Sequence, residues 1–357
     1  MTSITDAEAM ARALELAERG WGRVHPNPMV GAVVVRDGAI VGEGWHAEYG
    51  GPHAEPVALA AAGAAARGAT LVVTLEPCAH HGKTPPCVDA VLAAGIARVV
   101  IAMRDPNPVA AGGIARLEAA GVEVVVGEQE DAARRLNARF VHAVTQAGRP
   151  FVAVKLAVTM DGCIADHAGR SQWISGPEAR AWVHWVRAGF DAIAVGAETA
   201  IVDGARLTVR GEIVPRVTPR RVVFDRGGHL EVSAPIFADL PEAPLTIVTA
   251  RAPEARQASW RMAGAAVCQA DSLEAGLGAL GTAGVEAVLV EGGGRLAGAL
   301  LGAELVDRVY QVVSPRWLGD GRRAWAGLGA LGIGDAPAWR TVERQALGND
   351  TLLVLER

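Results

Sequence analysis

Hydrophobic and polar residues in the first half of the chain follow a pattern that is typical of an α/β unit. Residues 5–19 place their apolar side chains at helical spacing, with Thr5 or Asp6 as the N-cap and Gly20 as the end. Residues 30–36 and 39–45 predict two strands joined by a tight hairpin turn. The other predicted elements are a helix from His53 to about Arg67, strands over 70–75, 98–103 and 122–126, and a helix from Cys87 to Gly95.

The second half opens with a new hydrophobic run after a break at Gly148-Arg149-Pro150. Residues 151–158 predict a strand, so we divide the chain into domains 1–146 and 147–357. Further predicted elements are helices over 179–187 and 295–301, strands over 192–196 and up to Glu291, and a short apolar strand that ends at Arg210. Strands and helices alternate again, so both domains are predicted to be α/β.

One imidazole and two thiolates form the most informative pattern of the chain. His53 opens a predicted helix, Cys78 follows a strand and Cys87 begins another helix, so the three can converge on one metal ion. Three protein ligands leave the fourth position of zinc open to water, whose pKa the metal lowers. Glu55 can carry a proton from that water to a leaving amine. The order matches the zinc base deaminase signature H-x-E…P-C-x-x-C, although here eight residues separate the cysteines.

A simpler interpretation of such residues is structural, because a cysteine in an alanine-rich chain is most often a small core residue. Four residue types in the correct order, each beside a predicted element end, favour the metal site. Cys163 and Cys268 have no partner pattern, and we interpret them as incidental thiols. Free thiolates used for metal fit a reducing cytoplasm. We expect neither a signal peptide before Asp6 nor a membrane-spanning segment.

Composition mainly excludes classes of partner. The 357 residues suffice for two domains, and half of them are hydrophobic, so each domain can bury a core. The net charge is −5, with acidic and basic residues mixed and without a Lys/Arg-rich block. This argues against nucleic acid as the main partner. We expect a small-molecule substrate, no membrane partner and a homo-oligomer.

A more specific signature lies in residues 27–33 (NPMVGAV), 51–55 (GPHAE), 76–87 (EPCAHHGKTPPC) and 105–108 (DPNP). These stretches resemble the deaminase domain of the bifunctional deaminase/reductase family of riboflavin biosynthesis. The resemblance implies a cytidine-deaminase-like fold and removal of an amine from a diamino-hydroxy-phosphoribosylamino-pyrimidine. It also implies the site residues: zinc ligands His53, Cys78 and Cys87, the general acid/base Glu55, and substrate contacts Asn27, His80 and Lys83. Asn107 stays an open candidate.

The second half carries its own signature in residues 155–162 (KLAVTMDG), 171–175 (SQWIS), 207–210 (LTVR) and 288–296 (VLVEGGGRL). These resemble the reductase domain of the same family, which implies a dihydrofolate-reductase-like fold and NADPH as cofactor. The implied substrate contacts are Ser171, Arg187, Leu207, Arg210 and Glu291. The implied NADPH contacts are Val158, Trp173, Thr199, Asp203, Gly293, Gly294, Arg295 and Leu296. Lys155 and Asp161 match family positions that position substrate or deliver a proton.

Physical chemistry agrees with this resemblance at two points. The glycines 292–294 separate a buried strand from a helix, where backbone N–H groups can approach a pyrophosphate. A G-x-G-x-x-G fingerprint is missing after the first strand, so a Rossmann domain is not supported. Arg187 and Arg210 offer planar donors suited to a ribose phosphate, and we expect both to reach one crevice.

Three functions remain open from the sequence. The first is a bifunctional enzyme that deaminates the pyrimidine and then reduces its ribosyl group to ribityl. The second is an active deaminase whose C-terminal domain only binds ligand or drives oligomerisation, because Gly204-Ala205 and Arg226 depart from the family pattern. The third is a deaminase of bases in nucleic acid, against which the acidic balance and the long spacer between the cysteines argue.

Overall fold

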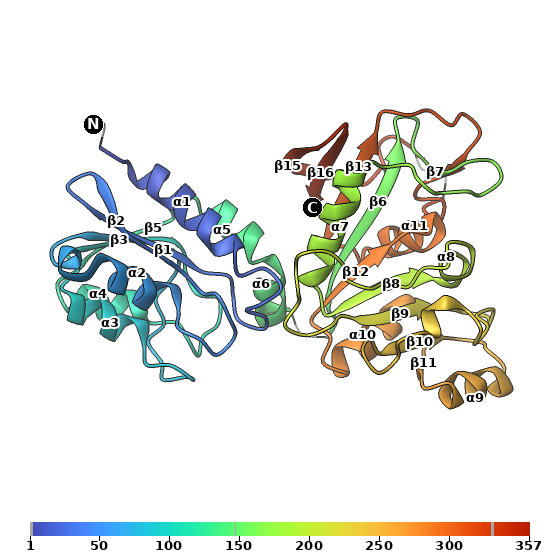
Figure 1. Cartoon of the computed structure of the whole chain (residues 1–357), viewed down its shortest axis with the longest axis horizontal. Coiled ribbons are helices and arrows are strands. Elements are labelled where there is room, and N and C mark those ends of the chain that lie inside the picture. Colours follow the sequence, from blue (N-terminus) through green and yellow to red (C-terminus); the bar gives the residue numbers. More distant parts are fainter. Residues whose placement is uncertain (1–2, 147, 330–331) are drawn as a thin grey trace. The chain divides into compact units, whose positions relative to one another are not determined.

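The chain forms two compact units, Met1–Ala147 and Gly148–Arg357. The structure is a computed structural model that describes residues 3–146, 148–329 and 332–357. Both units are built from strands and helices that alternate along the chain, as the colours of Figure 1 show.

A five-stranded sheet forms the centre of the N-terminal unit, in the order β2-β1-β3-β4-β5. Strand β1 is antiparallel to both of its neighbours, whereas β3, β4 and β5 are parallel. The strands are β1 (Gly31–Arg36), β2 (Ala39–Trp45), β3 (Thr70–Leu75), β4 (Arg98–Met103) and β5 (Glu123–Val126). The helices are α1 (Asp6–Glu18), α2 (Ala54–Ala62), η1 (Gly63–Ala66), α3 (Cys87–Ala94), α4 (Gly113–Ala119), α5 (Glu130–Leu136) and α6 (Ala138–Thr145).

Two glycines bring helices against opposite faces of this sheet. A Cβ atom at Gly31 would lie 1.9 Å from the Ala13 carbonyl oxygen of α1, and one at Gly44 would lie 2.4 Å from the Ala58 nitrogen of α2. Gly44 pairs with Ala32, so Gly31 and Gly44 face opposite sides of the sheet. The unit therefore has three layers, with α1 and α2 on different faces (Figure 1).

The predicted elements of this unit are present, with one boundary corrected. Thr5 caps α1 through a capping box, and Gly95 ends α3 in the left-handed conformation. The helix expected to run to Arg67 leaves the α-helical path at Gly63, where φ is +54°, and continues as the 3-10 helix η1. The alanine-rich composition hid this break, because alanine favours a helix on either side of it.

The C-terminal unit contains a nine-stranded sheet in the order β11-β10-β9-β8-β12-β6-β13-β16-β15. Strand β16 is antiparallel to both neighbours, and all other pairings in the sheet are parallel. The strands are β6 (Phe151–Thr159), β8 (Ala192–Gly196), β9 (Arg220–Phe224), β10 (Leu245–Thr249), β11 (Ala266–Gln269), β12 (Ala287–Glu291), β13 (Arg308–Ser314), β15 (Arg340–Leu347) and β16 (Asp350–Glu356). β7 (Cys163–Ala165) and β14 (Arg322–Arg323) form a separate pair.

Buried central strands require helices on both faces of this sheet. Every residue of β12 is buried, as are the first four of β8, which is typical of parallel sheets covered on each side. The helices are α7 (Pro177–Ala188), α8 (Ala197–Val202), η2 (Pro235–Phe237), α9 (Glu254–Met262), α10 (Leu273–Thr282) and α11 (Gly294–Gly302). The core joins Val154, Val288 and Val290 of the strands to Leu277 and Leu300 of the helices.

The short strand expected to end at Arg210 is wrong. Residues 204–210 form neither helix nor strand. Gly204 and Leu207 have φ values of +56° and +52°, which interrupt an extended chain. Alternating apolar residues over so short a stretch do not distinguish a strand from a buried loop. Leu207 is buried as part of a loop.

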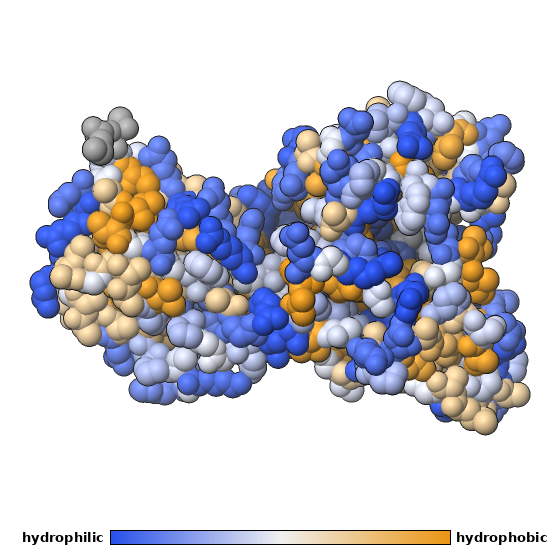
Figure 2. Space-filling model, viewed as in Figure 1, coloured by the Kyte–Doolittle hydropathy of each residue, from blue (hydrophilic) through white to orange (hydrophobic). Residues whose placement is uncertain are grey.

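Hydrophilic residues cover most of the face shown in Figure 2, with hydrophobic residues in separate groups between them. Within the described part of the chain, no helix has both the length and the apolar character needed to cross a membrane.

Candidate active sites

The first candidate site lies where two helices begin beside the end of a central strand. His53 is the N-cap residue of α2, and Cys87 is the first residue of α3. Cys78 lies three residues after the end of β3. Each position follows from the element ends predicted from the sequence, and together they form the His53–Cys78–Cys87 cluster.

The ligand atoms of this cluster lie within 4.8 Å of one another. His53 Nδ1 is 3.2 Å from Cys87 Sγ and 3.7 Å from Cys78 Sγ. Both cysteines are buried. A hydrogen bond from the Cys87 thiol to the Cys78 sulfur lowers the pKa of Cys78 well below its ordinary value. The same bond, together with burial, raises the pKa of Cys87.

The other nitrogen of His53 has a partner that sequence reasoning missed. Thr84 Oγ1 lies 3.4 Å from His53 Nε2, so the ring is held with Nδ1 toward the sulfurs. Such a bond orients a metal ligand and fixes its tautomer. Thr84 belongs to the spacer between the cysteines, whose length was the only signal that pointed to it.

Glu55 is buried beside the cluster, in the first turn of α2. Burial raises the pKa of its carboxyl group, against the opposing effect of His53. Its Oε2 is buried without a hydrogen-bond partner among the residues that the structure describes. Because an unsatisfied buried oxygen is costly, this atom is available to a proton donor at the site.

Glu76 anchors the loop that carries Cys78. Its side chain is buried and accepts hydrogen bonds from the backbone nitrogens of Asp105 (3.2 Å), Gly112 (3.0 Å) and Ile114 (3.1 Å). The Cys78 loop is thereby fixed to the segment before α4. Burial raises the pKa of Asp105 in this segment to about 6.

Asn27 reaches the cluster through His46, which sequence reasoning also missed. Asn27 Nδ2 lies 3.1 Å from His46 Nε2, and His46 Nδ1 lies 2.9 Å from the Pro52 carbonyl oxygen. The rings of His46 and His53 meet edge to face at 5.2 Å. This chain of contacts ties Asn27 to the residue that precedes His53.

His80 and Lys83 lie on the spacer between the two cysteines. His80 Nδ1 is buried without a partner in the described part of the chain. Lys83 is exposed, and its Nζ lies 4.0 Å from the centre of the Tyr49 ring. Asn107 uses its side chain to accept from the Val109 nitrogen, so it caps a turn.

The second candidate site is a cavity of about 870 Å³ in the C-terminal unit. Its walls include the ends of β8 and β12, helix α7 and the segment 203–210. In open α/β sheets, ligands bind beyond the carboxyl ends of the strands. The residues expected there that line the cavity are Ser171, Trp173, Arg187, Thr199, Asp203, Leu207, Arg210, Glu291, Gly293, Gly294 and Arg295.

A buried ion pair crosses one wall of the cavity. Arg187 Nε and Nη2 donate to the two carboxylate oxygens of Glu291, at 2.6 and 2.7 Å. Arg187 Nη1 donates to the Thr208 carbonyl at 2.7 Å. Burial would raise the pKa of Glu291, but Arg187 lowers it overall. Burial also lowers the pKa of Lys155, which lines the same cavity.

Arg187 is therefore largely committed within the protein. Three of the five N–H donors of a guanidinium are used by Glu291 and Thr208. Arg210 differs, because its guanidinium has no acidic partner among the described residues. Arg187 and Arg210 do reach one cavity, but they are not equivalent donors.

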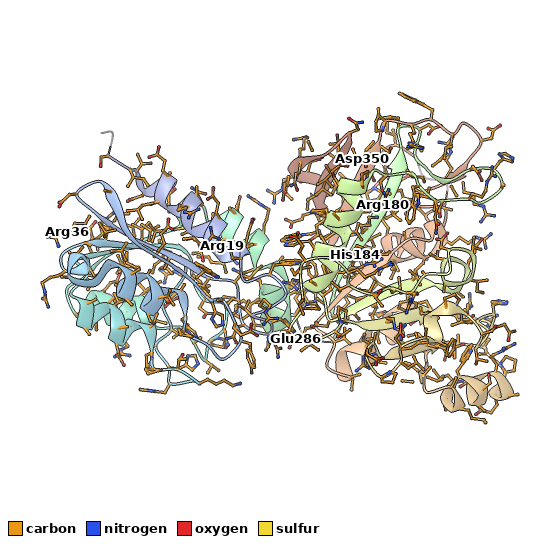
Figure 3. All side chains as sticks on the ribbon, in the orientation of Figure 1. Arg19, Arg36, Arg180, His184, Glu286 and Asp350 are labelled. Atoms are coloured by element: carbon orange, nitrogen blue, oxygen red, sulfur yellow. The ribbon has the colours of Figure 1, made fainter. Side chains whose placement is uncertain are left out.

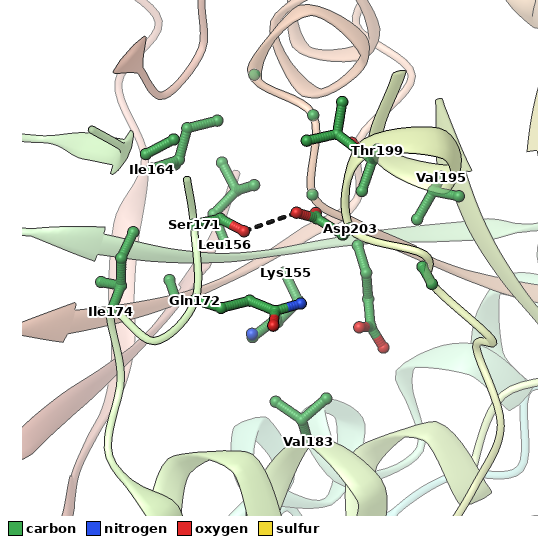
Figure 4. Close-up of a pocket in the computed structure, with 18 of the residues that line it drawn as sticks. Lys155, Leu156, Ile164, Ser171, Gln172, Ile174, Val183, Val195, Thr199 and Asp203 are labelled. Atoms are coloured by element: carbon green, nitrogen blue, oxygen red, sulfur yellow. Dashed lines mark hydrogen bonds between the residues drawn. The ribbon is translucent and has the colours of Figure 1, made fainter. Parts of the chain in front are cut away.

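Ser171, Asp203 and the glycine turn also line the cavity. Ser171 Oγ donates to Asp203 Oδ1 at 2.7 Å, and Figure 4 shows this bond together with Lys155 and Gln172. Gly292 and Gly293 have φ values of +73° and +79°. A Cβ atom at Gly293 would lie 3.0 Å from Thr199 Oγ1, so glycine keeps this turn open.

Val158 and Leu296 do not line the cavity. Their exposures are 3 % and 9 %, and both side chains pack in the core. The family resemblance identified the positions of Val158 and Leu296 along the chain. It could not tell whether their side chains line the cavity or pack in the layer behind its wall. Other lining residues that were not singled out include Gln172, Arg180, His184 and Arg322.

Comparisons with known proteins agree with this geometry. Residues 3–103 match the family described as the cytidine and deoxycytidylate deaminase zinc-binding region. Residues 150–353 match the RibD C-terminal domain, which is more than half of the chain. The chain belongs to the RibD family.

Relatives match over nearly the whole length of the chain. The riboflavin biosynthesis protein RibD of Escherichia coli is 40% identical, over 98% of this chain and 99% of the relative. The RibD protein of Aquifex aeolicus is 39% identical, over 99% of this chain and 98% of the relative. The solved structure of Acinetobacter baumannii RibD superposes with a TM-score of 0.82 at 36% identity, covering 98% of both chains. The solved structure of a Thermotoga maritima deaminase/reductase superposes with a TM-score of 0.82 at 38% identity, again covering 98% of both chains.

Membership in the RibD family confirms several predictions from the sequence. The chain is a bifunctional enzyme of riboflavin biosynthesis, with a zinc-binding deaminase domain and an NADPH-dependent reductase domain. The expected α/β fold class is confirmed as well. Because the family combines deaminase and reductase, a C-terminal domain that only binds ligand or drives oligomerisation is not supported.

Proposed function

We propose that this enzyme deaminates a 2,5-diamino-6-(phosphoribosylamino)pyrimidinone and then reduces the ribosyl group of the product to ribityl phosphate. The solved Thermotoga maritima relative is named as a diaminohydroxyphosphoribosylaminopyrimidine deaminase and 5-amino-6-(5-phosphoribosylamino)uracil reductase. The two candidate sites lie in separate units, each of which suits one of the two reactions.

We assign His53, Cys78 and Cys87 as the zinc ligands. Zn–N bonds of about 2.0–2.1 Å and Zn–S bonds of about 2.3 Å at tetrahedral angles place ligand atoms roughly 3.6 Å apart. The separations of 3.2 and 3.7 Å from His53 Nδ1 fit this spacing. Zinc bound by these residues lowers the pKa of a water molecule toward neutrality.

Glu55 is the general acid/base of the deamination. Its buried Oε2, which has no hydrogen-bond partner among the described residues, takes the proton from water and delivers it to the departing amine. Asn27, His80 and Lys83 bind the substrate. The His80 Nδ1, which has no partner in the described part of the chain, and the exposed ammonium of Lys83 suit polar and phosphate groups of a phosphoribosyl pyrimidine.

The reductase site divides between substrate and cofactor. Arg210 binds the phosphate of the substrate, while Arg187 and Glu291 shape the wall beside Lys155. Ser171 and Leu207 complete this side of the cavity. NADPH supplies a hydride. The turn at Gly293 and Gly294 leads into α11, where backbone N–H groups suit its pyrophosphate. Glycine is needed there because a side chain would meet Thr199 or the Arg323 carbonyl. The other cofactor contacts are Trp173, Thr199, Asp203 and Arg295, with Val158 and Leu296 behind them.

The convergence of His53, Cys78, Cys87 and Glu55 carries this proposal. The experiment supplies the purified enzyme with the diamino substrate and NADPH and follows ammonia release and NADPH oxidation together. We expect ammonia to appear first and NADPH to be consumed only after it. NADPH oxidation that precedes ammonia release would contradict the order of the two reactions.

A further inference from the structure

We propose that His184 is a positioning residue of the reductase site, which holds the segment 207–210 so that Arg210 faces the substrate phosphate. This inference rests on the proposed function, in which Arg210 binds that phosphate. His184 lines the same cavity as Arg187 and Arg210.

Two hydrogen bonds attach this segment to one face of α7. His184 and Arg187 are three residues apart, so both project from the same side of the helix. His184 Nδ1 accepts from the Arg210 backbone nitrogen at 3.2 Å, and Arg187 Nη1 donates to the Thr208 carbonyl at 2.7 Å. Figure 3 labels His184 on α7. The helix therefore holds the segment at two backbone groups, one of them that of Arg210.

The segment needs such an attachment because its own conformation is unfavourable. Leu207 has a φ of +52° although it is not a glycine, and such a conformation persists only where its surroundings enforce it. The buried Leu207 side chain fixes one end. At the other end, the Arg210 guanidinium has no acidic partner in the described part of the chain, so its direction depends on the backbone that carries it.

The bond also determines the tautomer of His184. A nitrogen that accepts from Arg210 N–H carries no proton, so in the neutral ring the proton is on Nε2. Burial lowers the pKa of His184, and Arg187 and Arg210 lower it further; Glu291 and the Thr208 carbonyl oppose them. Protonation would turn Nδ1 into a donor and break the bond, so the segment is held by the neutral ring.

Three substitutions separate this role from simple packing. Asn Oδ1 is as far from its own backbone, in bonds, as His Nδ1, whereas Gln Oε1 is one bond farther. We expect His184→Ala and His184→Gln to raise the KM of the pre-deaminated pyrimidine by about 2- to 12-fold, which is one neutral hydrogen bond. The KM of NADPH should stay near the wild-type value, which also reports an intact fold. His184→Asn should restore most of the substrate affinity, and an Asn variant as weak as Ala would overturn the role of Nδ1.

The pH profile gives an independent readout. As the pH falls through the lowered pKa of His184, the KM of the wild type should rise more steeply than that of His184→Asn, which cannot be protonated. Ionisation of the substrate phosphate near pH 6 affects both proteins, so their ratio isolates the histidine. Parallel profiles would count against the inference.

Arg210→Ala distinguishes this inference from the proposed function. If His184 acts through Arg210, adding His184→Ala to Arg210→Ala should raise the KM no further. An Arg210→Ala variant with wild-type KM would overturn the phosphate role of Arg210. A large effect of Arg210→Ala with none of His184→Ala would leave that role intact and overturn only the positioning by His184.

Discussion

The role of a single side chain in this enzyme depends on whether other protein groups already use its hydrogen-bonding atoms. Among the described residues, Glu55 Oε2 and His80 Nδ1 are buried without a hydrogen-bond partner, which marks them for a ligand. Arg187 has the opposite character, because Glu291 and Thr208 use most of its donors. Sequence reasoning grouped Arg187 with Arg210 as two phosphate donors. The structure separates them, since only contacts reveal which arginine is free.

Zinc content and deaminase rate should separate ligands from the acid/base. We expect Cys78→Ser, Cys87→Ser and His53→Ala to lose zinc and deamination, because each removes one of three protein ligands. Glu55→Gln should keep zinc but lose the rate by about 10²–10⁴-fold. Cys268→Ser is the matched control and should keep both properties. Metal analysis with an ammonia assay gives both values, and a Cys87→Ser protein with full zinc would refute the ligand set.

Removal of the charge on Glu291 should destabilise the C-terminal unit. Breaking one partner of a buried ion pair costs about 3–5 kcal/mol, because the other charge stays buried. The side chains of Arg187 and Glu291 are only 12% and 11% exposed. We therefore expect Glu291→Gln to lower the free energy of unfolding strongly in denaturant titrations. The control is Glu254→Gln, at an exposed pair with Arg261, which should change it by less than about 1 kcal/mol.

The Arg187–Glu291 pair also predicts that the stability of the C-terminal unit depends on pH. The pKa of Glu291 is lowered in the folded enzyme, so its stabilising effect is present above the ordinary value of about 4.3. It is lost as the pH falls through the lowered value, because the unfolded chain then binds the proton more readily. The stability difference between wild type and Glu291→Gln should shrink over that acidic range. A difference that stays constant there would mean that the Glu291 charge is not what stabilises the unit.

At the scale of elements, the ends of helices and strands were more predictable than the loops between them. His53, Cys78 and Cys87 could be placed because caps and hydrophobic runs mark the ends of α2, β3 and α3. Thr84, His46 and His184 could not be predicted as partners, because each makes contacts set by the tertiary fold. The segment 204–210 was misjudged for a related reason: its positive φ at Leu207 leaves no mark in the composition.

Gly113 should be essential to the loop that presents Cys78. A Cβ atom there would lie 1.8 Å from the Pro77 carbonyl oxygen, so alanine must displace the loop. We expect Gly113→Ala to lower the free energy of unfolding by about 1–3 kcal/mol and to weaken zinc retention in a chelator competition. Gly121→Ala is a useful comparison, because an added Cβ meets no neighbour there, although its φ of +83° adds local strain. Equal zinc retention in both variants would show that the Pro77 contact does not control the site.

At the scale of the whole molecule, the chain joins two units with separate cores and separate sites. The sequence predicted this organisation because each half has its own alternation of strands and helices and its own chemical signature. Each site takes its predicted residues from one unit only. The two reactions should therefore respond to different changes in the protein.

Removal of zinc and loss of Arg210 should affect opposite halves of the reaction. Chelation of the wild type, or Glu55→Gln, should abolish ammonia release but leave NADPH oxidation with pre-deaminated substrate, because hydride transfer uses residues of the other cavity. Arg210→Ala should instead weaken binding of the reductase substrate and leave ammonia release unchanged. Loss of a hydrogen bond to a charged group removes about 1.5–3 kcal/mol, so the KM of the reductase substrate should rise about 10- to 150-fold while the KM of NADPH and the deamination rate change little. Steady-state assays with each substrate supplied separately measure all three quantities. A folded Glu55→Gln enzyme without reductase activity would show that the sites are coupled, and an Arg210→Ala enzyme that loses NADPH affinity instead would assign Arg210 to the cofactor.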